Sequence, residues 1–317
     1  MPNLERPGYE RDSGTFATLK RTFKEFSQDN LTDWAAALTY YGVLALFPAL
    51  IALVSIVGLV FSPTEITKAL EEIVGQLGPT TAVDTLKGPI EGIASGGSKT
   101  GIMLIIGVLA ALWSASGYVG AFMRASNIMY EVDEGRAIWK LRPLQMVVTL
   151  IMILLIALAA IAVVVTGPVA EAVGSAIGVG DTAVTVWNIA KWPVLILVLM
   201  LMIAVLYYAS PNAKVGRFKF ITLGAVVAVL IWIVASVAFA FYVANFGSYD
   251  KTYGSLGGVV VFLVWLYISN VAFLFGAQLN AERERSEQFE KGVEGAERDL
   301  RLGERDEPKE KQRKQTA

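Results

Sequence analysis

The chain has 317 residues, of which 55% are hydrophobic and only 17% are charged, whereas a soluble domain typically has about 45–50% and about 25%. Cysteine and histidine are both absent, which excludes disulfides, catalytic units built on a thiol or an imidazole, and the zinc or haem sites that need either residue. The formal net charge of -1 provides no basic field, so we expect no nucleic-acid partner, and we expect no metal or other cofactor.

Residues 1–34 are polar and charged and are predicted to form a cytoplasmic N-terminal segment. Within them Phe16, Leu19, Phe23 and Phe26 recur at helical spacing among basic residues. This pattern predicts a basic amphipathic helix that lies on the inner leaflet of a membrane. Packing of the same apolar stripe against a helical bundle is an equally good interpretation.

Six long windows without Asp, Glu, Lys or Arg follow. Each can supply the roughly 20 apolar residues that a helix needs to cross a bilayer. The windows run from Ala35 to Thr64, Thr100 to Met123, Pro143 to Ala170, Trp192 to Ala213, Phe220 to Tyr249, and Thr252 to Ala281. The sequence therefore predicts an all-α, polytopic membrane protein with a six-helix transmembrane domain over residues 35–281.

The distribution of Lys and Arg predicts that both termini are cytoplasmic, because connections rich in these residues stay on that side. The basic connections contain Arg6, Arg11, Lys20, Arg21 and Lys24 before the first span, Arg124, Arg136, Lys140 and Arg142 after the second, and Lys214, Arg217 and Lys219 after the fourth. The opposite connections hold fewer for their length, namely Lys68, Lys87, Lys99, Lys191 and Lys251.

Three segments outside the spans have patterns of their own. The loop between the first two spans has two helical patterns split by Gly78-Pro79, which predicts a small helical cap on the outer face. Residues 167–180 are rich in Gly and Ala and fit a short interfacial or a re-entrant helix. Residues 282–317 are more than half charged, so we expect them to continue the last helix and to end as a largely disordered cytoplasmic tail.

A helical wheel of the second span places several polar residues on one stripe with small residues. The stripe contains Trp113, Gly117, Gly120, Arg124, Asn127 and Glu131. Small residues let another helix approach, and an ionisable side chain at membrane depth is a candidate functional residue. Alternatively, Arg124 extends to the inner interface and pairs with Glu131 or a lipid phosphate.

Other polar features of the spans add candidate residues. Asn270 lies deep in the last span and needs a partner, for which an interhelical hydrogen bond is the favoured interpretation. The first span has Tyr40 and Tyr41 in its first turns and Pro48 in its middle. The proline would provide a hinge or a groove, or be tolerated structurally.

The connection between the last two spans is aromatic and glycine-rich. It includes Asn245 and Tyr253, and its glycines allow close backbone approach. Such a connection would suit the gating of an outer opening.

Six short motifs occur in order along the chain. They are Asp33-Trp-Ala-Ala-Ala-Leu-Thr-Tyr-Tyr41, Leu46-Phe-Pro48, Leu112-Trp-Ser-Ala-Ser116, the group Asn127, Tyr130, Glu131, Arg136 and Trp139, Tyr253-Gly-Ser-Leu-Gly257, and Gly276-Ala-Gln-Leu-Asn-Ala281. Over about residues 16–281 this combination resembles the YihY/BrkB family of bacterial inner-membrane proteins. Gln278 departs from the family pattern, which often has an acidic residue there, so any role of that carboxylate is in doubt here.

The resemblance implies an all-helical, multi-pass bundle in the bacterial inner membrane. For the family it suggests transport or lipid handling and an association with serum resistance in a pathogen, and some members carry a ribonuclease BN label. The present sequence argues against a nuclease, since it has no His or Cys for a zinc site and no basic soluble domain. Because no nucleophile–base pair or carboxylate dyad is visible either, we expect that the protein is not an enzyme.

Two functional hypotheses follow. The first is a transporter or lipid-translocating protein for an anionic or amphiphilic substrate, in which Arg124 attracts the anion and Asn127, Glu131 and Asn270 shape the pathway. The second is a membrane organiser that does not transport, and that binds membrane lipids or a partner through its N-terminal helix and charged tail. The oligomeric state is left open. The full set of pathway candidates is Arg124, Asn127, Glu131, Trp113, Asn270, Tyr40, Tyr41, Pro48, Asn245, Tyr253 and Gln278.

Overall fold

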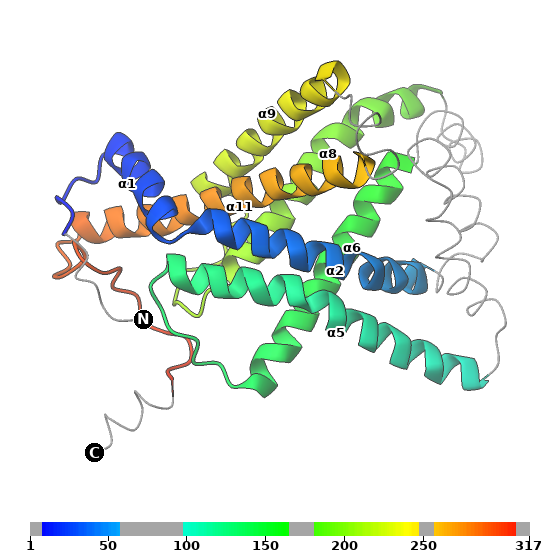
Figure 1. Ribbon diagram of the computed structural model, residues 1–317, viewed down its shortest axis with the longest axis horizontal. Coiled ribbons are helices and arrows are strands. Elements are labelled where there is room, and N and C mark those ends of the chain that lie inside the picture. The colour runs from blue at the N-terminus through cyan, green and yellow to red at the C-terminus, as the bar shows by residue number, and fades with distance from the viewer. Residues whose placement is uncertain (1–7, 58–97, 165–180, 247–256, 309–317) are drawn as a thin grey trace. The chain divides into compact units, whose positions relative to one another are not determined.

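The computed structural model describes residues 8–57, 98–164, 181–246 and 257–308 (Figure 1). In these ranges the chain is helical, has no strand, and contains one isolated β-bridge between Ala213 and Glu304. The helices there are α1 (Thr15–Gln28), α2 (Leu31–Val57), α5 (Ser98–Met129), α6 (Ile138–Val164), α8 (Asp181–Ala209), α9 (Leu223–Phe246) and α11 (Gly257–Glu290). The predicted all-helical class is therefore confirmed for the described part of the chain.

Five of the described helices are long and apolar enough to cross a bilayer. By length and composition the candidate spans are Leu31–Ala52, Ile138–Ala160, Thr185–Ala209, Leu223–Val243 and Gly257–Glu290. Each overlaps a charge-free window of the sequence. Helix α5 covers the remaining window but is not among these five. The count of six spans and the orientation of the termini thus remain predictions.

Three predicted segments lie outside the described residues. They are the two helical patterns in the loop after the first span, the Gly- and Ala-rich stretch at 167–180, and the glycine-rich connection that contains Tyr253.

The chain divides into two compact units. The first comprises residues 1–42, 118–143 and 203–317, and the second comprises residues 43–117 and 144–202. The second unit has a small apolar core in which Ala52, Ala111, Leu112 and Ile153 are buried. The cavity and the two polar clusters described below lie within the first unit.

Helices α9 and α11 pack closely in the first unit, and glycines make this possible. Gly224 and Gly276 face each other, with no room for a side chain on either, which is how membrane helices bring their backbones together. Beside this contact Asn280 accepts a hydrogen bond from the Gly224 N–H (2.9 Å) and donates one to Thr222 (3.0 Å). Asn280 thus satisfies a free backbone donor at the start of α9.

Helix α1 packs against α11 through its polar face. Its buried residues are Thr18, Arg21, Thr22 and Glu25. Its apolar stripe points outward: Phe16 is 81% exposed and Phe23 62%, although Phe23 and Phe26 still contact Phe275 of α11. The helix therefore contacts α11 through its polar face and through Phe23 and Phe26, whereas Phe16 of the apolar stripe remains exposed.

Residues 291–308 are folded against the rest of the first unit, which differs from the predicted disorder. Ala296 and Leu300 are buried, and the backbone of this segment bonds to the chain at Tyr9, Asn212 and Lys214. Some of its charges, among them Glu297, Arg305 and Asp306, are paired or hydrogen-bonded to other parts of the chain, and for this reason the composition was misleading. The continuation of the last helix beyond Ala281 is confirmed, since α11 ends at Glu290.

Candidate functional site

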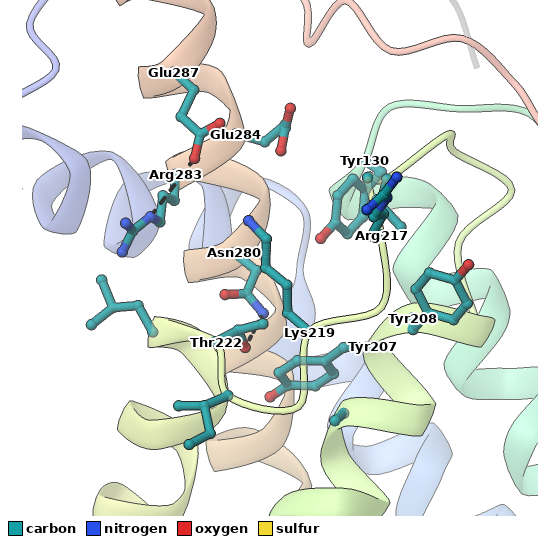
Figure 2. A pocket seen from close by; sticks show the side chains of 15 residues that line it. Tyr130, Tyr207, Tyr208, Arg217, Lys219, Thr222, Asn280, Arg283, Glu284 and Glu287 are labelled. Atoms are coloured by element: carbon teal, nitrogen blue, oxygen red, sulfur yellow. Dashed lines mark hydrogen bonds and ion pairs between the residues drawn. The ribbon is translucent and has the colours of Figure 1, made fainter.

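A cavity of about 200 Å³ opens in the first unit (Figure 2). It lies among the end of α8, the segment from 210 to 222, the start of α9 and the last turns of α11. Its charged and amide side chains are Arg217, Lys219, Asn280, Arg283, Glu284 and Glu287. Three basic residues and two acidic residues thus line the cavity, a mixture that binds a charged or dipolar group rather than an apolar one.

The segment from 210 to 222 is fixed at its base by Asn212. Helix α8 ends at Ala209, just before Ser210-Pro211, because proline cannot continue the hydrogen-bonding of the helix. The backbone N–H of Asn212 donates to the Asn127 side chain (2.7 Å), and its amide nitrogen donates to the carbonyls of Asp133 (2.7 Å) and Asp306 (2.8 Å). The base of the segment is therefore held, while its later residues extend toward the cavity.

The charged side chains on the two sides of the cavity differ in how far they are paired. Arg217 and Lys219 are exposed and have no ion pair or hydrogen bond in the described part of the chain. On α11, half-buried Glu284 forms no hydrogen bond or close ion pair in the described residues, but the charges of Lys291 and Lys219 act on it. Glu287 lies 4.0 Å from Arg283 and 3.7 Å from Lys291. Figure 2 shows both acidic side chains on α11 and the Lys219 side chain extending toward that helix beside Asn280.

Tyrosines form the inner wall of the cavity. The Tyr207 hydroxyl donates to the carbonyl of Phe273 (2.5 Å), and its ring stacks on Phe122 at 6.2 Å. Tyr208 is covered on its ring by the Arg305 guanidinium at 4.9 Å and contacts Phe218 edge-on at 5.5 Å. These rings are occupied by protein contacts, so they shape the cavity more than they offer free binding faces.

A buried arginine–glutamate cluster lies where α1, α5 and α11 meet. Arg285, of whose side chain 2% is exposed, donates to Glu282 (3.2 Å) and to Glu131 (2.8 Å). Arg21 donates to the other oxygen of Glu282 (3.1 Å) and to Ser286 (2.6 Å). Since buried charges are tolerated only when they are paired and hydrogen-bonded, this cluster is best explained as the structural joint of these elements.

The N-terminal segment adds a further contact to this joint. The Tyr9 hydroxyl donates to Glu25 at 2.5 Å. Burial, together with that hydrogen bond to a carboxylate, raises the pKa of Tyr9, so the phenol stays protonated.

A second polar group joins the α5–α6 connection to the end of α8. Glu134 accepts hydrogen bonds from Arg136 (2.6 and 2.8 Å) and from Asn127 (3.0 Å). Burial acts to raise the pKa of Glu134, but the hydrogen bonds and charge of Arg136 outweigh it and lower the pKa. Arg136 also donates to the carbonyl of Ser210 (2.9 Å) and so caps the negative end of α8.

Five of the six residues of the predicted stripe lie on α5 at helical spacing, but they have different surroundings. Trp113 is 54% exposed, Arg124 is exposed with its guanidinium 5.6 Å from the centre of the Tyr41 ring, and Asn127 is buried. Helix α5 ends at Met129, and Glu131 has a positive φ of 52°, so Glu131 leaves the helical stripe. It pairs with Arg285 instead of Arg124.

The interhelical bond expected of Asn270 is confirmed. Its oxygen accepts from the Tyr118 hydroxyl (2.8 Å) and its nitrogen donates to Thr39 (3.1 Å), so one amide, 1% exposed, joins α11 to α5 and α2. Gln278, two turns further along α11, is equally buried, and its side-chain oxygen has no hydrogen-bond partner in the described structure.

The remaining candidates are scattered. Tyr40 is exposed and contacts Tyr41 edge-on at 5.5 Å. Pro48 lies within α2, which continues to Val57. The side chain of Asn245 and all of Tyr253 lie outside the described residues.

None of the predicted pathway residues lines the cavity. Sequence reasoning used Arg217 and Lys219 only for topology, and it used Asn280 only as part of a motif. The sequence did contain an indication of this site, because two basic residues stand close together just before Thr222 and the start of α9. The cavity could not be predicted from these two residues alone, since the residues on α11 that also line it come about sixty positions later in the chain.

Comparison with known proteins gives a consistent result. The family model described as "Virulence factor BrkB" matches residues 22–300. A Bacillus subtilis protein named "Putative ribonuclease-like protein YfkH" is 31% identical over 83% of this chain and 94% of its own length. Proteins named "UPF0761 membrane protein" from Aeromonas salmonicida (27% identical, 85% of this chain and 89% of theirs) and Haemophilus influenzae (26%, 81% and 91%) also match.

No solved structure matches the chain. The family match extends over all the motifs quoted above, and the relatives are covered almost in full. The chain is therefore a membrane protein of the BrkB/UPF0761 family.

Proposed function

We propose that the protein transports or translocates an anionic or amphiphilic substrate across the bacterial inner membrane, and that the cavity beside Arg217 and Lys219 receives it. The observation that carries the proposal is a cavity lined by two exposed basic side chains that form no hydrogen bond or close ion pair in the described structure, Lys219 being attracted only through its charge by Glu284. Guanidinium and ammonium groups bind phosphate and carboxylate strongly when both are held in place.

The surroundings of the cavity fit a substrate that comes from the membrane. The cavity adjoins the ends of three candidate spans, α8, α9 and α11. By the positive-inside rule the segment that contains Arg217 and Lys219 is cytoplasmic. A headgroup at the inner leaflet would therefore reach the cavity while its chains stay in the membrane.

Arg124 is the predicted pathway residue that the arrangement leaves most open to a substrate. It is exposed and stacked on Tyr41, which positions its charge without neutralising it. Asn127 and Asn270 form hydrogen bonds within the fold, so their contribution to a pathway would be to hold its walls.

Reconstitution into proteoliposomes tests the proposal. A lipid-scrambling assay with fluorescent lipids and an anion-flux assay should show activity that falls in the double variant Arg217→Gln/Lys219→Gln. Lys20→Gln, which also removes an exposed charge but lies on α1, is the control. Activity that is absent from the wild-type protein, or unaffected by the double variant, would exclude this role for the cavity. Arg124→Ala with unchanged activity would exclude the role of Arg124 alone.

A second candidate function, the non-transporting membrane organiser, is favoured by α1. Its exposed Phe16 and Phe23 and its exposed Lys20 and Lys24 form the kind of surface that binds anionic bilayers. This function requires no flux. It is tested by exchanging Phe16 and Phe23 for Ser, which should abolish the cellular phenotype of the protein while leaving any flux in proteoliposomes unchanged.

A further inference from the structure

The charges in the cavity are divided between two walls. Arg217 and Lys219 lie on the connecting segment. Glu284 lies on α11, where Arg283 and Glu287 also line the cavity and contact each other at 4.0 Å. None of these three forms a hydrogen bond or a close ion pair in the part of the chain that the structure describes, although Lys219 and Lys291 act on Glu284 through their charge. A ligand with negative charge alone would satisfy the basic wall but would bring its charge toward a carboxylate, and like charges placed together oppose binding.

The hydrogen-bonding groups indicate what kind of positive charge would satisfy the acidic wall. Asn280 and Thr222 bond to each other, and Asn280 also accepts from the backbone of Gly224, so these groups are largely in use. An ionised carboxylate such as that of Glu284 can only accept hydrogen bonds. A primary ammonium, with three N–H donors, matches such an acceptor.

A quaternary ammonium fits the cavity less well. Groups of that kind bind through the faces of aromatic rings. Here the Tyr207 ring stacks on Phe122, and the Tyr208 ring is covered by Arg305. Of the three tyrosines that line the cavity, two therefore have a protein group against the ring, and the third, Tyr130, is buried, so no exposed cage of aromatic faces is available to a choline.

The size of the cavity limits the ligand to a headgroup. Its volume is about 200 Å³, below the roughly 300–1,000 Å³ of pockets that enclose a whole drug-sized molecule. Acyl chains would have to remain outside.

We propose that this cavity binds a phosphoethanolamine group, with its phosphate at Arg217 and Lys219 and its primary ammonium at Glu284. The inference rests on the proposed function, because it names the substrate class for the same cavity. The group has two sources, the headgroup of phosphatidylethanolamine and the free compound.

Native mass spectrometry of the full-length protein in detergent tests the proposal without any mutation. The protein is mixed with equal amounts of phosphatidylethanolamine, N-acetyl-phosphatidylethanolamine, phosphatidylcholine and phosphatidylglycerol with identical acyl chains. We expect phosphatidylethanolamine adducts to exceed each of the others by about tenfold, the factor that one charge-assisted hydrogen bond supplies. Equal retention of phosphatidylethanolamine and its N-acetylated form would overturn the proposal, since these lipids differ in the ammonium.

Variants then assign the two ends of the headgroup. Glu284→Gln should remove the preference for phosphatidylethanolamine over phosphatidylglycerol, while Arg217→Gln/Lys219→Gln should weaken the retention of both. Glu290→Gln makes the same chemical change on an exposed residue of the same helix outside the cavity and should keep the wild-type preference. A preference that persists in Glu284→Gln would show that the acidic wall does not recognise the ammonium.

Two further measurements separate the sources and the functions. Loss of the lipid adducts when free phosphoethanolamine is added shows that the free compound also binds, whereas their persistence assigns the cavity to the lipid; both results support the headgroup chemistry. Selective retention without scrambling in proteoliposomes would overturn the proposed transport and leave this inference standing. Scrambling with no headgroup preference in either assay would overturn this inference and leave the proposed transport standing.

Discussion

Gly224 of α9 and Gly276 of α11 lie so close that a methyl group on Gly224 would stand 2.0 Å from the Gly276 carbonyl oxygen, and one on Gly276 would stand 2.3 Å from that of Gly224. Both nearest atoms belong to the backbone, so no side-chain rotation can relieve the overlap. The two helices must separate to accept even one added carbon. This contact also sets the position of Asn280, which bonds to Gly224 beside the cavity.

Gly276→Ala should therefore lower the stability of the protein by about 1–3 kcal/mol, the usual cost of overpacking. Thermal unfolding in detergent, followed by tryptophan fluorescence, measures it. Gly258→Ala is the control, because a methyl group at that position of α11 would meet nothing within 4 Å. Equal midpoints for the two variants would show that the α9–α11 contact is looser than described.

Removing Arg285 should destabilise the fold strongly. Arg285→Met removes the guanidinium that pairs with Glu131 and with one oxygen of Glu282, and breaking a buried pair from one side costs about 3–5 kcal/mol. The same unfolding measurement detects this. Arg283→Met on the same helix removes an exposed guanidinium with only a distant contact to Glu287 and should change the unfolding midpoint little. Similar losses in both variants would contradict the structural role of the cluster.

The pair formed by Glu134 and Arg136 should make stability depend on pH in the acidic range. The pKa of Glu134 lies below its ordinary value of 4.5 in the folded protein, so the stabilisation is complete above that value and is lost as the pH falls through the folded pKa. Wild-type protein should thus be more stable than Glu134→Gln at pH 6, and the difference should shrink below pH 4.5. Unfolding midpoints measured from pH 6 to pH 3 check this, and a constant difference would contradict it.

Arg305 should control how firmly residues 291–308 are held. Its guanidinium donates to the carbonyls of Ala213 (2.9 Å) and Tyr208 (2.7 Å), so Arg305→Gln removes two charge-assisted bonds at the edge of the cavity. We expect faster amide hydrogen exchange in residues 300–308 and faster proteolytic cleavage there. Arg298→Gln, at an exposed position of the same segment, should leave both rates unchanged. Equal rates in the two variants would show that other contacts hold the segment.

The helices could be predicted from the sequence because lipid imposes a simple requirement. A span must exclude charge over about 20 residues, and the charge-free windows show this directly. The need of Asn270 for a partner was predictable for the same reason. The identity of that partner was not, since Tyr118 and Thr39 lie 152 and 231 positions away.

The candidate site was less predictable, because it depends on which charged and polar side chains contact one another in the folded chain. Charged composition indicated a solvated tail, yet Arg305 donates to the carbonyls of Ala213 and Tyr208, and Asp306 bonds to the Asn212 side chain and to Lys140. The wheel placed Glu131 on a helix that in fact ends two residues earlier. In both cases local pattern was overruled by contacts between residues that are distant in sequence.

The outward stripe of α1 affects how the protein must be handled. A protein that places Phe16 and Phe23 on its surface and uses Arg21 and Glu25 inside needs an amphiphile around this helix as well as around its spans. Detergents with small micelles would leave those rings in water, where they would promote self-association of the purified protein. A detergent with a large micelle, or a nanodisc, should keep it monodisperse, and exchange of the two phenylalanines for serine should remove the difference between these preparations.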